Sequence, residues 1–399
     1  MTTDQPDDNR TEAQGDCAVR SPHAALRYRA HGYRGACRVT EEALLRISQR
    51  WARRLLILVP AVLLVLFTAC SDPMTTIEPK SDFTEAIQGV YEIVFWLSMF
   101  VFVAIMLLTL WLAVRYRERP GQVANQIHGN TRLEVLWTII PVAIVLVMLV
   151  PTWQVIADTT ATPPDDSMVI EATGKQWWFE FKYPELGITT ANELHLSVDR
   201  PAHVKLYSDD VIHSFWIPQL AGKVDMVPGH ENDLWFTPDA DSVREEAYLG
   251  QCVEFCGASH ANMRFRVYVH TAEEFDAWAQ NELSDAVEPT SELGQLGATL
   301  FVVRCAECHT IRGTAASIAD FGPDLTHIGS RETIAAGILD NNIDNLVDWI
   351  SNPAEIKPGI NPENDITDKD PPLRFMRAFE EEISAEDILA IATYLSELK

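Results

Sequence analysis

Two long uncharged segments constrain the fold of this chain more than any other feature. Residues 93–114 and 135–156 are each 22 residues long and contain no Asp, Glu, Lys or Arg. About 20 apolar residues are enough for a helix to cross a bilayer. Neither segment has the polar stripe that a helix at the surface of a soluble core would show. We therefore expect a transmembrane hairpin over residues 71–157, with spans at about 90–114 and 135–156.

The charges in the loop between these segments predict their orientation. Basic side chains outnumber acidic ones in this loop: Arg115, Arg117, Arg119 and Arg132 against Glu118 and Glu134. The positive-inside rule places such a loop in the cytoplasm. Everything after residue 157 is then expected on the outer side of a bacterial plasma membrane.

A shorter apolar segment, residues 55–67, follows a group of arginines and ends in Phe67-Thr-Ala-Cys70. This pattern is typical of the apolar part of a signal peptide and its cleavage site, and it resembles a bacterial lipoprotein signal. Residues 1–70 are therefore interpreted as a leader, whose removal would leave Cys70 as an acylated N-terminus. Phe67 is a departure, because an aliphatic residue is usual at this position. The leader is unusually long, and its length favours a start codon further downstream. The alternative is an uncleaved third span.

The length of 399 residues predicts two or three domains, and the charge is unevenly divided. Residues 1–162 have 15 basic and 15 acidic side chains, whereas residues 163–399 have 16 basic and 42 acidic ones, so the second part holds the whole net charge of −26. An acidic surface repels the phosphates of nucleic acids, which excludes them as partners. It would attract a basic protein, although a solvated acidic surface without a partner gives the same composition.

Short β-type segments follow the hairpin. Several of them alternate apolar and polar residues, as half-buried strands do, and Pro and Gly separate them. They are residues 168–172, 177–181, 194–198, 203–207 and 265–269. Their number and spacing favour an antiparallel sandwich or barrel over residues 163–280.

Near the end of this region, four side chains with metal-binding groups lie within twelve residues: Cys252, Cys256, His260 and Met263. His213 stands upstream. Thiolate, imidazole and thioether ligands together suit copper used for electron transfer, whereas structural zinc takes thiolates and imidazoles. Two cysteines allow each sulfur to bridge two metals. The alternatives are buried inert thiols, histidines satisfied in the core and a methionine that only packs there. The remaining histidines of the region are interpreted as ordinary strand or loop residues: His195, His203, His230 and His270.

A separate module is predicted for residues 292–399. Before it, Thr271-Ala-Glu-Glu274 opens a short helix with a capping box, and residues 281–291 follow as an acidic linker. The module contains Cys305-Ala-Glu-Cys308-His309 directly after a predicted helix. This C-x-x-C-H pattern attaches a haem through two thioethers and supplies its proximal histidine. The alternative is a chance zinc half-site, but a single cysteine pair lacks the other ligands of a zinc ribbon.

The opposite side of the haem needs a second ligand. Met376 is the only methionine after His309, and His327 is its competitor. An insertion, residues 361–371, lengthens the loop before Met376. Four residues are interpreted as packing where the first and last helices of the module cross: Gly297, Phe301, Tyr394 and Leu395.

With these motifs, the region from about residue 80 to 280 resembles subunit II of the haem–copper terminal oxidases, cytochrome c oxidase in particular. Residues 292–399 resemble a class I cytochrome c. The segments that match subunit II are Thr131–Trp137, Gly174–Phe179, His213–Pro218, Lys223–Gly229 and Gln251–Met263. The resemblance implies a multidomain chain with a two-helix transmembrane hairpin, a cupredoxin-like Greek-key β-sandwich and an all-α cytochrome c domain.

The resemblance also implies the ligands of a dicopper CuA centre. Cys252 and Cys256 would bridge the two coppers. His213 and Met263 would complete one copper. His260 would complete the other, together with a backbone carbonyl.

By the same resemblance, that carbonyl belongs to Glu254, whose side chain would face a magnesium ion at the interface with subunit I. Trp177 matches the position at which electrons enter from a cytochrome c. The alternative for Trp177 is a solvent-facing residue of a hydrophobic docking patch. The family position favours Met376 as the second ligand of a covalently attached haem c, although Arg377 stands where proline is usual.

The activity implied is that of an oxidoreductase subunit in a proton-pumping respiratory complex. Electrons would pass from the fused haem to the dicopper centre and on to a haem of subunit I, which reduces oxygen. The two spans contain no histidine, so they offer no ligands for an oxygen site. The expected partners are subunits I and III, membrane lipids and, as donor, cytochrome c or a cytochrome bc complex. The alternatives are the corresponding subunit of a CuA-containing nitric oxide reductase and a copper-binding lipoprotein scaffold.

Overall fold

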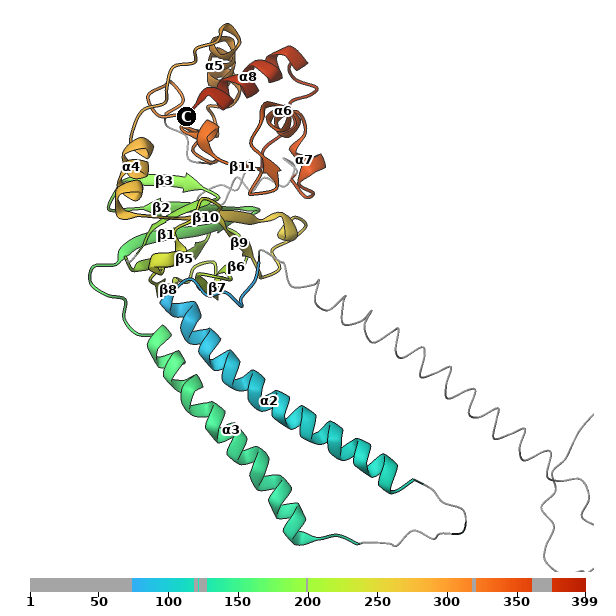
Figure 1. Cartoon of the computed structure of the whole chain (residues 1–399). Helices are drawn as coiled ribbons and strands as arrows, with labels where there is room; N and C mark the ends of the chain where they lie inside the picture. Colours follow the sequence, from blue (N-terminus) through green and yellow to red (C-terminus); the bar gives the residue numbers. More distant parts are fainter. Residues whose placement is uncertain (1–73, 118–120, 122–127, 199, 318–320, 361–374) are drawn as a thin grey trace, which may run out of the picture. The chain divides into compact units, whose positions relative to one another are not determined.

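The computed structural model describes residues 74–117, 121, 128–198, 200–317, 321–360 and 375–399. The leader with Cys70 and the insertion at residues 361–371 lie outside the described residues, and the expectations about them stay predictions. The described chain contains two long apolar helices, a β-sandwich and a C-terminal module that is mainly helical (Figure 1).

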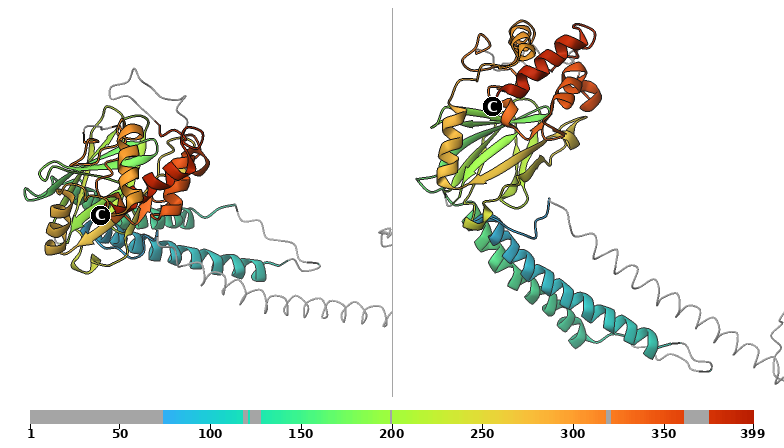
Figure 2. Two further views of the ribbon diagram at one scale, coloured as in Figure 1. Left: turned by 90° about the horizontal axis from the view of Figure 1, so that it is seen from above. Right: turned by 45° about the horizontal axis from the view of Figure 1, so that its top comes forward.

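The two apolar segments form helices α2 (Asp82–Arg115) and α3 (Thr131–Thr159). Both are long and apolar enough to cross a membrane, and none of the most apolar stretch of either helix is buried within the protein. The helices run side by side (Figure 2). Lipid would cover such a surface, so the exposure of these side chains is what a transmembrane hairpin requires.

Helix α2 is attached to the sandwich through its first turn. The N-cap Ser81 accepts a hydrogen bond from the Thr84 N–H at 3.1 Å, and its hydroxyl donates to the Leu220 carbonyl at 2.6 Å. The ring of Phe83 fills the space where Gly222 has no side chain, since a Cβ there would lie 2.4 Å from the ring. The hairpin therefore continues into the sandwich through buried contacts.

The sandwich consists of two five-stranded sheets. The first sheet has the strand order β3 (Ile188–Ala191), β2 (Trp178–Tyr183), β1 (Met168–Lys175), β5 (Ala202–Ser208) and β8 (Asn232–Phe236). The second has the order β4 (Glu193–Ser197), β10 (Arg264–His270), β9 (Tyr248–Cys252), β6 (His213–Ile217) and β7 (Ala221–Met226). Each of the five predicted β segments falls on a strand, and β1 and β10 alternate buried and less buried residues as predicted.

The expectation that this sandwich is antiparallel was wrong for two strand pairs. β1 pairs with β5, and β4 with β10, in parallel. Parallel neighbours need a long connection, and here three strands of the chain lie between β1 and β5. Alternation along each segment predicts a strand but carries no information about its partner, so the direction of pairing could not be read from it.

The C-terminal module begins after helix α4 (Ala272–Glu282), which has the predicted capping box at Thr271 and Glu274. Its helices are α5 (Glu292–Arg304), α6 (Ile343–Ser351), α7 (Pro353–Ile356) and α8 (Ala385–Glu397). It also contains a short ladder of β11 (Thr333–Ile334) and β12 (Leu339–Asp340), which an all-α domain would lack. Single 3₁₀ turns occur in the sandwich and in this module: η1 (Ala240–Ser242), η2 (His260–Asn262) and η3 (Ile328–Ser330).

Helices α5 and α8 cross at Gly297, as predicted. A Cβ at this position would lie 2.0 Å from the Ala390 carbonyl oxygen, so only glycine permits the approach. One turn later, the rings of Phe301 and Tyr394 meet edge to face at 5.8 Å. Both rings belong to the apolar core of the module.

Two of the histidines that were interpreted as ordinary strand residues lie together on β4 and β10. His195 Nδ1 and His270 Nε2 are 2.8 Å apart, and the His195 ring stacks on Trp278 of α4 at 4.2 Å. Burial lowers the pKa of His195 to about 3. Nearby, burial raises the pKa of Glu193 to about 7. Both groups are therefore held in their uncharged forms over part of the acidic range.

We expect His195 to make the sandwich less stable as the pH falls below 6.5. The unfolded chain binds a proton there, whereas folded His195 does not until about pH 3, so unfolding is favoured by about 2 kcal/mol at pH 5. His195→Gln should remove this contribution. Hydrogen exchange of β4 and β10 amides at pH 7 and pH 5 measures it. Glu193 changes the stability in the opposite sense, but it is present in both the parent protein and His195→Gln. The same pH dependence of amide exchange in these two proteins would therefore contradict the expectation.

Candidate functional site

Neighbouring strands bring the predicted copper ligands together. His213 begins β6 and Cys252 ends β9, and Phe215 of β6 is paired with Cys252. A loop then carries Cys256 to the turn η2, which starts at His260. Residues 39 positions apart in sequence thus meet at one end of the second sheet, because β6 and β9 are adjacent.

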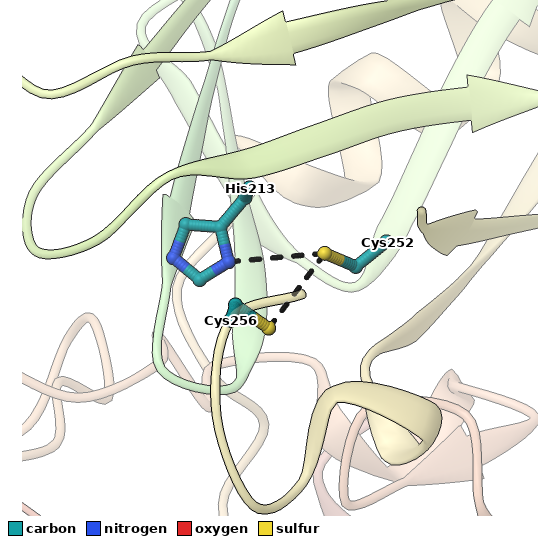
Figure 3. A group of neighbouring side chains, drawn as sticks. All are labelled: His213, Cys252 and Cys256. Carbon is teal, nitrogen blue, oxygen red and sulfur yellow. Dashed lines mark hydrogen bonds between the residues drawn. The ribbon is translucent and has the colours of Figure 1, made fainter. Parts of the chain in front are cut away.

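The two sulfurs lie at the centre of this group, as Figure 3 shows for three of its members. Cys252 Sγ and Cys256 Sγ are 3.7 Å apart, which is much longer than a disulfide bond of about 2.05 Å. His213 Nδ1 lies 3.9 Å from the Cys252 sulfur. The ligand atoms of these three residues all lie within 4.8 Å of one another.

The remaining predicted ligands surround the same pair of sulfurs. His260 Nδ1 lies 3.7 Å and Met263 Sδ 3.9 Å from the Cys256 sulfur. The Glu254 carbonyl oxygen lies 3.2 Å from the Cys252 sulfur, while the Glu254 side chain is exposed. Two thiols, two imidazoles, a thioether and a carbonyl therefore converge. This donor set fits copper better than zinc, since zinc rarely takes a thioether.

The hydrogen bonds around the two cysteines and His213 favour the binding of a cation. Hydrogen bonding with the Cys256 sulfur lowers the pKa of Cys252, and the same interaction raises that of Cys256, so the pair readily holds one thiolate. His213 Nε2 bonds Asp210 Oδ1 at 2.7 Å, which turns Nδ1 toward the sulfurs. Burial alone would lower the pKa of His213, but its bonds to Asp210 and Cys252 raise it.

Asp210 was missed in the sequence. Its second carboxylate oxygen accepts the Gln176 N–H at 2.6 Å, so it joins the β1–β2 connection to the ligand His213. The available signal was an aspartate three residues before a predicted ligand, in a turn. That signal is weak, because aspartate is common in turns for local reasons.

A large apolar cavity adjoins the C-x-x-C-H segment. Cys305, Cys308 and His309 all line it, together with Phe301 and Met376. His309 Nδ1 lies 3.0 Å from the Pro323 carbonyl oxygen, so it donates there and leaves Nε2 for a metal. The cavity, the paired cysteines and the oriented imidazole fit a haem bound through two thioethers.

The two candidates for the distal ligand occupy different places. Met376 lines the cavity, whereas His327 is absent from its described lining. His327 is 2% exposed, and its Nε2 faces the Ser284 carbonyl oxygen at 3.3 Å, in the linker. This placement favours Met376.

Trp177 also lines this cavity, with its neighbours Gln176 and Trp178. It is only 6% exposed, and its ring lies 5.8 Å from that of Phe375 in the C-terminal module. Its indole N–H donates to the Cys256 carbonyl oxygen at 3.0 Å. Trp177 is therefore not the solvent-facing residue of a docking patch. It lies between the cavity and a cysteine of the metal cluster.

Lys357 is a second residue that the sequence did not reveal. It is 3% exposed and lines the cavity beside Trp177, where its ammonium group donates to the Trp177 backbone oxygen. Burial lowers the pKa of Lys357 to about 7. No local motif marks this lysine, because its partners come from distant parts of the chain.

Comparisons with known proteins agree with this arrangement. Residues 78–155 match the transmembrane domain of cytochrome c oxidase subunit II, residues 188–269 match its periplasmic domain, and residues 294–399 match cytochrome c. Subunit 2 of cytochrome c oxidase from Alkalihalophilus pseudofirmus is 33% identical over 85% of this chain and 96% of the relative. The corresponding protein of Bacillus subtilis is 32% identical over 76% of this chain and 90% of the relative.

Among solved structures, the periplasmic domain of subunit II of cytochrome oxidase from Bradyrhizobium japonicum is similar. It is 29% identical and covers 30% of this chain and 96% of its own, with a TM-score of 0.28.

Proposed function

The chain belongs to the family of cytochrome c oxidase subunit II, with a cytochrome c domain at its C-terminus, and from this we infer that it is the subunit through which electrons enter a membrane-bound oxidase. As such it is a component of an oxidoreductase complex. Electrons would arrive at the C-terminal domain, pass to the copper cluster and leave for a haem of subunit I, where oxygen is reduced.

The observation that carries this proposal is the position of Trp177. Trp177 lines the haem cavity, and its N–H is bonded to the carbonyl of Cys256. Gln176 donates to the same carbonyl at 2.7 Å. One buried indole therefore stands between the two candidate cofactor sites. A chain that only stored copper would have no need of this arrangement.

When bound, a dicopper group and a c-type haem each supply one-electron redox chemistry. For the copper, Cys252 and Cys256 would provide thiolates, and His213, His260, Met263 and the Glu254 carbonyl would provide the remaining ligands. Asp210 holds the His213 ring in place. Burial of the cysteines and of Met263 limits the movement of water when the charge of the cluster changes.

For the haem, Cys305 and Cys308 would provide the thioether bonds, and His309 and Met376 would hold the iron through a ring nitrogen and a sulfur. The bond from His309 to Pro323 fixes the ring tautomer. The exposed carboxylate of Glu254 would face a magnesium ion at the interface with subunit I.

The same proposal includes the orientation and the partners. The arginine-rich loop lies in the cytoplasm, and the copper and haem domains lie on the outer side of the bacterial plasma membrane. Subunits I and III and membrane lipids surround α2 and α3. The donor is a cytochrome c or a cytochrome bc complex. Since Trp177 is covered, this donor docks on the haem domain.

Electron paramagnetic resonance of the full chain, loaded with copper and haem in detergent, tests the proposal. The oxidised protein is expected to show hyperfine structure from one unpaired electron shared by two coppers. That signal should disappear as electrons are added through the haem, because the haem passes them on. The haem absorbance, recorded on the same sample, shows how many electrons have been added.

Two results would contradict this expectation. One is a pattern from a single copper. The other is copper that stays oxidised while the haem is fully reduced. Either would favour a copper-binding scaffold next to an unrelated cytochrome.

A further inference from the structure

A short segment of the cytochrome c domain, Lys357–Ile360, lies against the sandwich beside the copper-binding loop. Lys357 Nζ donates to the backbone oxygen of Trp177 in the sandwich. It also donates to the Ala335 carbonyl of its own domain, at 3.3 Å. A single buried ammonium group therefore connects the two domains at the residue that separates their cofactor sites.

The residues that follow Lys357 continue this contact. Ser259, between the ligands Cys256 and His260, donates to the Pro358 carbonyl at 2.6 Å. Gly359 has a φ of +92°, and a Cβ there would lie 2.7 Å from both Trp177 Cη2 and Ala258 Cβ. Any side chain at this position would push the segment away from Trp177.

Ala335 belongs to a second region of contact between the two domains. Its neighbour Ala336 accepts the Arg264 N–H of β10 at 3.2 Å, and the Glu332 N–H is bonded to the Glu193 carboxylate at 3.3 Å. Ala335 and Ala336 have φ values of 55° and 62°, which non-glycine residues rarely adopt. Lys357 thus ties this bent segment to Trp177 and joins the two regions of contact.

Burying a lysine ammonium group between two domains costs free energy, because the group loses its hydration. An apolar side chain of the same length would avoid the loss of hydration, so stability alone does not explain the residue. Buried polar groups do select one arrangement over others, because only that arrangement satisfies their hydrogen bonds. Here the arrangement selected is the one with Trp177 against the haem cavity.

We propose that Lys357 is a positioning residue, which holds the haem cavity against Trp177 and so keeps the electron path to Cys256 short. The proposal rests on the function inferred above. The step concerned moves one electron from the reduced haem, which is oxidised, to the oxidised copper cluster, which is reduced. No proton moves and no bond is formed or broken.

The test uses the assembled oxidase with Lys357→Met, which keeps the length of the side chain but removes the donor. Hydrogen exchange is followed at the Arg264 and Glu332 amides, whose bonds cross the interface. Their exchange should become about 10- to 100-fold faster, the factor expected when such hydrogen bonds no longer favour the closed arrangement. Lys399→Met is the matched control at an exposed lysine and should leave exchange unchanged.

The second readout is the rate at which an electron, placed on the haem by a light flash, reaches the copper. This rate should fall in Lys357→Met by more than the measured change in the reduction potentials of the two centres accounts for, since the variant also removes a charge from the cavity wall. A residue that merely stabilised the fold would not slow the transfer selectively. Gly359→Ala displaces the same segment from Trp177 without changing the lysine, and it should give the same two changes.

The outcomes separate the two proposals. If the parent oxidase shows no transfer from haem to copper, the proposed function is wrong and the role of Lys357 falls with it. If the parent shows the transfer, but Lys357→Met and Gly359→Ala match it in both exchange and rate, the positioning role alone is overturned. If Lys357→Met does not assemble, Gly359→Ala decides by the same criteria.

Discussion

Oxygen consumption by membranes that carry Cys256→Ser is expected to fall by about 100-fold or more, because even residues behind the metal ligands typically contribute 10- to 100-fold to metal binding. Cys256 is the centre of the site. Its sulfur lies 3.7 Å from both Cys252 Sγ and His260 Nδ1, and 3.9 Å from Met263 Sδ. Serine removes the sulfur that lies beside all of these groups, so two coppers would no longer be held.

The measurement combines copper content, oxygen consumption with a reduced cytochrome c, and the haem spectrum of the same membranes. The haem spectrum is the internal control, because Cys305, Cys308 and His309 lie in another domain. It should be unchanged in Cys256→Ser, while copper and activity are lost together. Normal oxygen consumption in this variant would contradict the proposed function. Loss of the haem as well would mean that the variant is misfolded, and Cys252→Ser would then decide between the two explanations.

The second large effect is expected at the distal side of the haem. Met376→Ala should lower the reduction potential of the haem by some hundreds of millivolts, within the roughly 0.8 V that axial ligands span. Each fall of about 59 mV makes the reduced haem tenfold less populated at a given potential. The external donor would then reduce only a very small fraction of the haem.

His327→Asn is the matched control for this prediction, since His327 was the competing ligand. It lies outside the described lining of the cavity, near the Ser284 carbonyl, and its replacement should leave the potential unchanged. A redox titration of the haem absorbance measures both variants. The reverse result, a large shift in His327→Asn and none in Met376→Ala, would assign the ligand to His327.

Some of this protein follows from neighbouring residues alone. The uncharged segments at residues 93–114 and 135–156 predicted the helices α2 and α3, because the bilayer requires a continuous apolar stretch. The capping box at Thr271 was predicted correctly because it depends only on residues within one helical turn. The short spacing of Cys305, Cys308 and His309 by itself predicted a haem site.

Other features depend on contacts between distant residues, and spacing carries no record of them. The parallel pairing of β1 with β5 follows from how the sheets close. Asp210 is recognisable only because it faces His213. The resemblance predicts Trp177 as the residue at which electrons enter, but its burial depends on the cytochrome c domain more than 100 positions later in the chain. The role of Lys357 depends entirely on contacts with residues distant in the sequence. Local motifs in the sequence predicted which residues could bind the cofactors. The placement of the two cofactor sites next to each other was decided by tertiary packing, because a hydrogen bond across a domain interface leaves no periodic pattern in the sequence.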